Sequence, residues 1–401
     1  MDSTNELEDP KIEIEITVHN TGYDYDIYNP NKGEESYYHV YINDSEDETK
    51  GNILFCKKKP DKIRILIDPQ ITSFKRLFRY CKCIETINFI KFPKNEIKTM
   101  EGMFFDCKGL KQIIFSDFYS DNVTDISAMF YGCSELQELN LSKVNTNNVT
   151  NMASMFAKCS SLEQLNFSNF NTNKITNMNG LFFACESLEK LDLSDFNTDN
   201  VIDMDSMFYK CSSLKELNIS NFNTSKVITM GRIFYQCLSL KELNLSNFNT
   251  ENVTNMGSMF NMCESLEKLN VSSFNTSNVT NMAGLFSCCK SLKELDVSNF
   301  NTTNVTSMLD LFVYCKSLKE INVSNFNTAN VNEMNEMFKG CKSLKKIDIS
   351  NFAFNDYIKA DKMFEDCSSL KFIHIPKRSW VLQSPSVFKG CPEDLEIKQA
   401  E

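Results

Sequence analysis

Cysteine thiols are the side chains of this chain best suited to chemistry, and twelve of the 16 cysteines recur at an interval of 26 residues. The recurring set is Cys81, Cys107, Cys133, Cys159, Cys185, Cys211, Cys237, Cys263, Cys289, Cys315, Cys341 and Cys367. Equivalent residues on neighbouring coils of a stacked repeat lie roughly 5 Å apart, a separation that permits disulfides. Each of these cysteines follows a phenylalanine by three residues, however, and one small apolar side chain per coil suits a packed core. We therefore expect buried, reduced thiols, with disulfide pairing or metal binding as the alternative.

The remaining reactive residues form no catalytic or metal-binding pattern. Cys81-x-Cys83 and Cys288-Cys289 each consist of one periodic cysteine and a neighbour. The three histidines, His19, His39 and His374, lie outside the regular coils and lack a metal-ligand spacing with cysteine. There are only 12 glycines, and none forms a phosphate-binding loop. We expect no enzymatic activity, no cofactor and no metal.

The unit from Cys211 to Cys237 indicates which elements position these residues. Its first half has the L-x-x-L-x-L spacing of a strand, and an Asn-Thr pair that is typical of a turn follows Phe222. Its second half places apolar residues at offsets of three and four, at Val227, Met230, Ile233, Phe234 and Cys237. This spacing predicts a short helix or 3₁₀ segment. We predict an α/β repeat fold: a right-handed leucine-rich-repeat solenoid with one parallel β-sheet and short helices or 3₁₀ segments opposite.

The repeat also predicts the domain organisation. Residues 1–55 are expected to form an acidic, β-rich capping region, residues 56–391 a solenoid of about 12 coils, and residues 392–401 a tail. Within the cap, residues 11–18 alternate like an exposed edge strand, and Tyr37–Ile42, Ile53–Cys56 and Ile63–Ile67 are further predicted strands. The irregular last coil, with Trp380, is expected to close the hydrophobic end of the stack.

Charge and hydropathy restrict the partners. Residues 1–50 carry 14 acidic and three basic residues, whereas the rest of the chain has 39 of each. Without a basic stripe we expect no nucleic acid partner. Residues 1–10 are acidic and polar, no apolar run reaches about 18 residues, and the chain stops at Glu401 soon after its last repeat-like cysteine. We therefore expect no secretory leader, no membrane insertion and no C-terminal anchor, which favours an intracellular location.

Written as F-x-x-C-x-S-L-x-x-L-[ND]-[LIV]-S-x-F-N-T-x-[NK]-V-T-x-M, the unit closely resembles the BspA-like leucine-rich repeat family over about residues 70–391. Members of that family are mostly surface or secreted proteins that are associated with adhesion to host proteins and other cells. The resemblance thus implies a cell-surface location and an adhesive role. It implies no catalytic residues.

The outward positions of the strand side are the candidate binding residues. They repeat as Lys-Glu pairs and an Asn/Asp position, and the candidate set is Lys215, Glu216, Asn218, Lys241, Glu242, Asn244, Lys293, Glu294 and Asp296. Such a flat polar face offers no aromatic or arginine anchor.

We expect a non-catalytic protein-interaction or adhesion scaffold that binds protein partners through the strand face and flanking loops. The alternative is a structural spacer whose binding function lies in the acidic N-terminal cap. An ice- or mineral-binding surface is disfavoured because Thr250 and Thr254 lack T-x-T spacing. The sequence specifies neither the partner's identity nor an oligomeric state.

Overall fold

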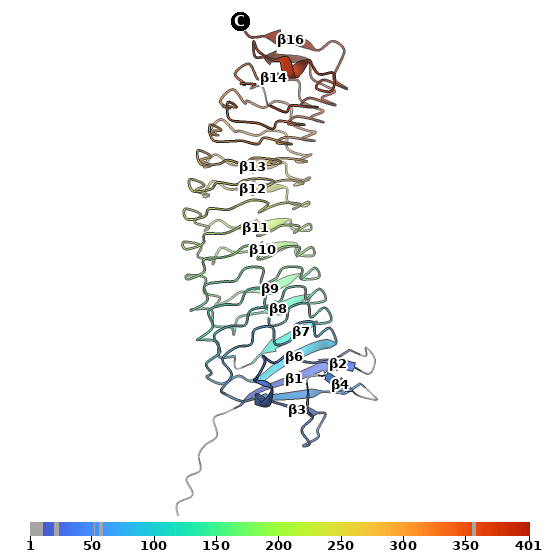
Figure 1. Ribbon diagram of the computed structural model, residues 1–401, viewed down its shortest axis with the longest axis vertical. Coiled ribbons are helices and arrows are strands. Elements are labelled where there is room, and N and C mark those ends of the chain that lie inside the picture. Colours follow the sequence, from blue (N-terminus) through green and yellow to red (C-terminus); the bar gives the residue numbers. More distant parts are fainter. Residues whose placement is uncertain (1–10, 20–23, 52, 56–58, 117, 355–357) are drawn as a thin grey trace, which may run out of the picture. The chain divides into compact units, whose positions relative to one another are not determined.

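The computed structural model describes residues 11–19, 24–51, 53–55, 59–116, 118–354 and 358–401. The chain divides into a first unit, Met1–Ile175, and a second unit, Thr176–Glu401 (Figure 1). Within the described ranges, no helix is long and apolar enough to cross a membrane.

Strands dominate both units. The first unit contains β1 (Ile12–Val18), β2 (Asp24–Asp26), 3₁₀ helix η1 (Glu35–Tyr37), β3 (Tyr38–Ile42), β4 (Ile53–Phe55), β5 (Ile63–Ile67), β6 (Ile84–Lys91), β7 (Gln112–Phe115), β8 (Glu138–Asn140) and β9 (Gln164–Asn166). The second unit contains β10 (Lys190–Asp192), β11 (Glu216–Asn218), β12 (Glu242–Asn244), β13 (Lys268–Asn270), β14 (Lys346–Asp348), β15 (Phe372–Ile375), 3₁₀ helix η2 (Trp380–Gln383) and β16 (Glu396–Gln399).

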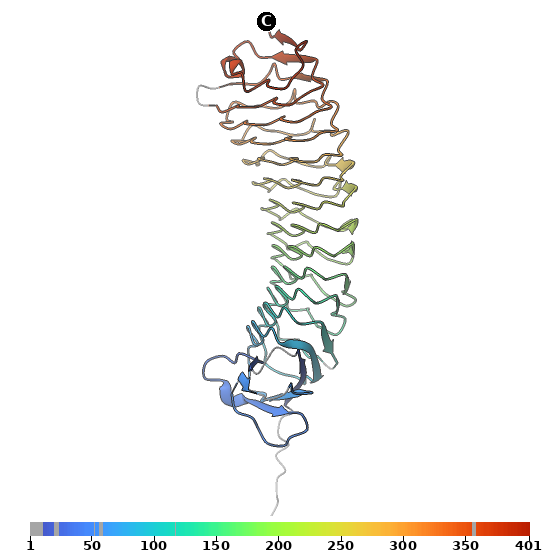
Figure 2. The same ribbon diagram turned by 90° about the vertical axis from the view of Figure 1, so that its right-hand side faces the viewer.

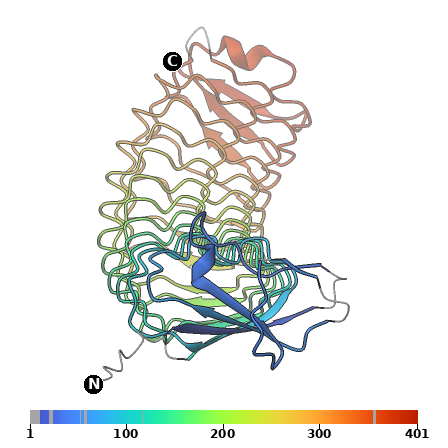
Figure 3. The same ribbon diagram turned by 60° about the horizontal axis from the view of Figure 1, so that its bottom comes forward.

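The first unit begins with a five-stranded sheet in the order β3-β5-β1-β6-β7 (Figure 3). β1 pairs antiparallel with both β5 and β6, and its isoleucines alternate into the core. The prediction that residues 11–18 form an edge strand was therefore wrong, because β1 is central. The predicted strands at 37–42 and 63–67 correspond to β3 and β5, and the strand predicted at 53–56 to β4, with Cys56 outside the described residues. The first parallel pairing is β6 with β7.

In the second unit the described strand pairs are parallel, and three of the four follow the 26-residue repeat. β10 pairs with β11, β12 with β13, and β14 with β15, in each case with the residue 26 positions away (Figure 2). Most of these strands are three residues long, and they form separate ladders rather than the single continuous sheet that the sequence predicted. The last ladder includes β16, which lies within the segment predicted as a tail.

The side opposite the strands consists of turns, so the predicted short helices were wrong. In the coil around Cys211, the N–H groups of Met207, Tyr209 and Cys211 each donate to the carbonyl three residues earlier and so close four-residue turns. The N–H groups of the residues between them, such as Phe208, donate instead to carbonyls of the next coil. Ser206 and Lys210 have φ of 57° and 58°, a left-handed conformation that no α-helix contains. The result is a β-solenoid of about 12 turns, and right-handed winding stays a prediction.

Stacked side chains fill the interior of each coil. In the second unit, Phe208, Phe234 and Phe260 are fully buried with ring centroids 5.6 and 5.8 Å apart, nearly parallel. At the end of this unit, Leu382 and Val387 are buried, whereas Trp380 is 48% exposed. The buried side chains of this last coil thus include Leu382 and Val387, and Trp380 itself lies at the surface.

Buried threonines connect the coils at the turn that follows each strand. The Thr224 hydroxyl donates to the Asn249 carbonyl at 2.7 Å, and the Thr198 hydroxyl accepts from the Asn223 N–H at 2.8 Å. Each hydroxyl thus satisfies backbone groups that the turn leaves unpaired.

Candidate functional site

We call the outward side chains of β10–β15 and of the coils between them the strand face. Each short strand places one apolar residue inward between two exposed ones: in β12, Leu243 is buried while Glu242 and Asn244 are exposed. All nine residues of the candidate set are exposed on this face, within the second unit. The alternation of the strand pattern was sufficient to predict that placement.

Ion pairs on the strand face run between coils. Lys215 lies 2.7 Å from Glu189, and Glu216 lies 2.7 Å from Lys190. The sequence neighbours Lys215 and Glu216 thus both pair with the preceding coil rather than with each other. Each exposed pair contributes about 0–1 kcal/mol, so these pairs set the pattern of charge more than they stabilise the fold.

The Asn/Asp positions end each strand and brace the turn that follows. Oδ1 of Asn244 accepts the N–H of Ser246 at 3.1 Å, and Oδ1 of Asp296 accepts the N–H of Ser298 at 2.9 Å. Hydrogen bonds from the hydroxyl and the N–H of Ser298 lower the pKa of Asp296. Asp296 is therefore a permanent negative charge on an exposed surface at neutral pH.

The strand ladder is interrupted between β13 and β14. The two intervening coils, at residues 294–296 and 320–322, form no strand. Among the described backbone groups at and next to these positions, only the Lys319 carbonyl accepts a hydrogen bond from the backbone of another coil, from the N–H of Lys345. The turn side of the same coils keeps its bonds, as in Phe286 to Leu311 at 3.0 Å. The coils remain attached on one side while the strand ladder is open on the other.

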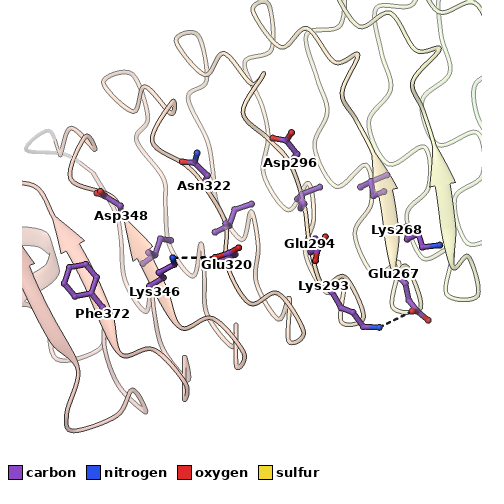
Figure 4. Close-up of a pocket in the computed structure, with 14 residues that line it drawn as sticks. Glu267, Lys268, Lys293, Glu294, Asp296, Glu320, Asn322, Lys346, Asp348 and Phe372 are labelled. Atoms are coloured by element: carbon purple, nitrogen blue, oxygen red, sulfur yellow. Dashed lines mark hydrogen bonds and ion pairs between the residues drawn. The ribbon is translucent and has the colours of Figure 1, made fainter.

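A groove of about 990 Å³ lies over this interruption (Figure 4). Its floor consists of Leu269, Leu295, Ile321 and Ile347, of which Leu269 and Leu295 are half-buried. Its walls are Glu267, Lys268, Lys293, Glu294, Asp296, Glu320, Asn322, Lys346, Asp348 and Phe372. Lys293, Glu294 and Asp296 of the candidate set therefore line a concave site, and the other six lie on the same face in earlier coils.

The charges in the groove do not cancel. Lys293 pairs with Glu267 at 3.3 Å, and Lys346 pairs with Glu320 at 3.7 Å. Lys268 pairs with Glu242, which lies outside the lining. The carboxylates of the lining that remain without a lysine partner are Glu294, Asp296 and Asp348, and Asp348 lies 3.2 Å from Nδ1 of His374. Three acidic groups thus give the groove an excess of negative charge.

Sequence reasoning missed Phe372. It pairs in register with Lys346, so a half-buried aromatic ring occupies an outward position that is charged in the preceding coils. The expectation that the strand face lacks an aromatic anchor is wrong at this coil. The signal was present in the sequence, since Phe372 stands where Glu320 and Lys346 stand in their own repeats.

A second surface, which we call the turn face, was also missed. It comprises the outward side chains of the turns opposite the strands. Several coils carry stacked aromatic rings two residues before the ladder cysteine. Phe183 and Tyr209 have centroids 4.5 Å apart, and Tyr209 and Tyr235 4.6 Å. The same position holds Asn261 and Ser287 in later coils. Variation at one position of an otherwise constant repeat is the signal that identifies it.

The cysteine ladder is structural. All 15 cysteines in the described part of the chain have free thiols, and those of the ladder are buried. In the second unit, the Cys237 thiol donates to the Phe208 carbonyl at 3.2 Å, and that carbonyl also accepts the N–H of Cys211. Burial raises the pKa of Cys211 to about 12. The groups are therefore neutral at pH 7 and unreactive as nucleophiles.

The histidines contact carboxylates near the ends of the chain. His39 lies 3.3 Å from both Glu48 and Asp68, and His374 lies 3.2 Å from Asp348. Over the described ranges, no cluster of three or more metal-ligating side chains occurs.

These features define a leucine-rich-repeat solenoid, a repeat protein whose conserved positions build the interior and whose outward positions form extended faces. The chain belongs to the family described as "Mycoplasma protein of unknown function, DUF285", which matches residues 72–188, 160–269, 209–320 and 286–391. No curated protein sequence matches it.

Several solved structures of bacterial proteins are similar to the chain. A leucine-rich repeat protein from Bacteroides ovatus is 18% identical, with 96% of this chain and 100% of the other covered and a TM-score of 0.47. A leucine-rich cell surface protein from Faecalibacterium prausnitzii is 16% identical, with 94% and 95% covered and a TM-score of 0.38. The pneumococcal vaccine antigen PcpA is 17% identical, with 76% and 78% covered and a TM-score of 0.34.

Proposed function

We propose that this protein is a non-catalytic, BspA-like scaffold that binds protein partners, in interaction or adhesion at the cell surface, through its strand face and flanking loops. The observation that carries the proposal is the strand face itself. Its outward positions repeat in every coil, they are exposed, and they include a groove at the open ladder. A repeated surface lets many weak contacts add along one extended partner.

The character of the contacts supports an extended partner over a compact one. Over most of the face the charged side chains are engaged in ion pairs between coils, as Lys215 is with Glu189. An exposed ion pair contributes little, and it exchanges partners at low cost. Binding energy is therefore distributed over coils, except where Phe372 offers an aromatic surface.

Partner capture by purified variants tests the proposal. The strand-face series changes Lys215 and Glu216, then also Lys241 and Glu242, then also Lys293 and Glu294, to alanine. We expect the captured amount of each partner protein to fall stepwise with each pair. The matched control, Tyr209→Ser with Tyr235→Ser on the turn face, should leave capture unchanged, with circular dichroism used to verify folding. Loss of capture in the control and retention in the series contradicts the proposal.

The second candidate is that the solenoid is a spacer and the acidic cap binds. The exposed loop at residues 43–48 supports it, because Asp44, Glu46 and Asp47 lie there together. Deletion of residues 1–55 is unsuitable as a test, since β1 supplies buried residues between β5 and β6. The variant Asp44→Asn/Glu46→Gln/Asp47→Asn leaves the sheet intact. If it alone abolishes capture, the cap is the functional part.

A further inference from the structure

We infer that the groove over the interrupted ladder receives an extended segment of a partner protein that carries lysine or arginine side chains. The inference rests on the proposed function and deepens it, since it specifies where on the strand face a partner docks and what chemistry the groove recognises.

The first argument is charge. Of the carboxylates that line the groove, Glu267 and Glu320 are neutralised by Lys293 and Lys346. Glu294, Asp296 and Asp348 have no lysine partner within the lining. Because hydrogen bonds to Ser298 lower the pKa of Asp296 and hydrogen bonds to Ser350 and His374 lower that of Asp348, these two groups remain ionised. A cationic segment complements this wall, and an anionic one is repelled by it.

The second argument is the floor. Leu269 and Leu295 of the floor are half-buried, as Leu217 of β11 is outside the groove, so apolar surface is accessible along the floor. Lysine and arginine have apolar stems that pack on such a surface while their charged ends reach a polar rim. The floor and rim of the groove therefore match the two parts of one side chain.

The third argument is Phe372. Its ring stands at the end of the groove, beside Lys346 and on the strand next to Asp348 (Figure 4). A guanidinium or ammonium group over an aromatic face is attracted by the negative face of the ring. Phe372 thus provides the anchor that the rest of the strand face lacks.

The dimensions favour an extended segment. The lining residues come from five successive coils, from Glu267 to Phe372. Neighbouring strands lie about 4.8 Å apart, so five coils span roughly 19 Å, the length of about six residues of extended chain. A single amine or a compact side chain contacts only part of such a site.

Fluorescence anisotropy with a labelled ten-residue peptide of alternating lysine and threonine tests the inference, at about 0.15 M salt, where long-range attraction is screened. The full chain should bind it, and the matching peptide of glutamate and threonine should not bind. Glu294→Gln/Asp296→Asn should weaken binding about fivefold, since two charge contacts are lost. Phe372→Ala should weaken it about threefold. The matched control Glu138→Gln/Asp192→Asn alters the same repeat positions outside the groove and outside the nine candidate residues, and it should change affinity less than about twofold.

Four outcomes overturn the inference: no binding of the lysine peptide, equal weakening in groove and control variants, equal binding of the glutamate peptide, or self-association of the chain that the groove variant abolishes. The last would identify a second copy as the occupant. If the peptide fails while the strand-face alanine series still lowers partner capture, only the groove assignment is wrong. If both fail, the proposed function is wrong as well.

Discussion

At the scale of single residues, cysteine at the ladder position combines small volume, apolar character and a donor. Alanine matches the first two properties and lacks the third, while serine adds a strongly solvated hydroxyl to a dry interior. In the ladder, the Cys263 thiol donates to the Phe234 carbonyl at 3.2 Å, and this carbonyl also accepts the N–H of Cys237. The recurrence of cysteine is explained by packing and by this hydrogen bond, without redox chemistry.

The buried thiols predict a loss of stability at alkaline pH. Thiols of the unfolded chain ionise near pH 8.5, at about their ordinary pKa, whereas burial raises the pKa of Cys211 and Cys263 to about 12. Below about pH 8.5 both states are protonated and the stabilisation is complete. As the pH rises from about 8.5 toward about 12, only the unfolded state loses protons, so stability falls. Urea unfolding at a series of pH values should show this fall, and Cys211→Ala/Cys263→Ala should make it shallower. A midpoint that does not change over this range contradicts the assignment.

Phe234 should contribute more to stability than any outward residue. Its ring is fully buried and stacks on Phe208 and Phe260 at 5.6 and 5.8 Å. Phe234→Ala should lower the free energy of unfolding by about 3–5 kcal/mol, through lost burial and an unfilled cavity. Glu242→Ala, on the strand face, should change it by less than about 1 kcal/mol. Equal unfolding curves for Phe234→Ala and the parent would refute its interior role.

At the scale of the elements, sequence reasoning identified the strand half of each coil and misidentified the turn half. The intervals of three and four residues between Val227, Met230, Ile233 and Phe234 fit an α-helix. They fit equally well a series of turns in which an N–H donates to the carbonyl three residues earlier. The discriminating signal lay between the apolar residues. In several coils, glycine occupies one of two positions with a left-handed backbone conformation, as Gly284 and Gly340 do. An α-helix contains no left-handed residue, so it would not favour glycine at these positions.

Because of the left-handed turn conformation, replacing glycine by alanine and replacing alanine by glycine at the same repeat position should have opposite effects on stability. Gly340 has φ of 70°, and a Cβ placed on it would collide with the ring of Tyr314. Gly340→Ala should therefore destabilise the fold by about 1–2 kcal/mol or more. Ala184, one residue before its own ladder cysteine, already has φ of 56°, so Ala184→Gly should be neutral or mildly stabilising. Denaturant unfolding of the two variants measures both. If the side opposite the strands were helical, Gly340→Ala would be tolerated and Ala184→Gly would lower the stability.

At the scale of the whole molecule, the fold follows from one repeated unit, whereas the groove does not. The period and the alternation of β12 were enough to predict which side chains point outward, and all nine candidate residues do. The groove depends on an interruption of the ladder at residues 294–296 and 320–322, where the local sequence matches that of paired coils. Spacing between coils is a property of the stack, and no single repeat encodes it.

A stack of coils also predicts a graded response to alkylation. The Cys391 thiol, in the last coil, is half-buried and has its pKa raised to about 11, while Cys211 is buried with a pKa of about 12. Cys288, which sits one residue before the ladder, is also half-buried. Mass spectrometry of the native protein after brief iodoacetamide treatment should find Cys391 and Cys288 modified first and the interior ladder last. Uniform modification of all thiols would contradict the burial of the ladder.

The most direct test of the central claim, that partners bind on the strand face, is site-specific photo-crosslinking in the second unit. A photoreactive residue replaces either Asn244 on the strand face or Tyr235 on the turn face, and each protein is illuminated with the same partner mixture. The account predicts crosslinked partner at position 244 and none at position 235. Crosslinking at position 235 with none at position 244 would contradict it and would assign binding to the aromatic positions of the turn face.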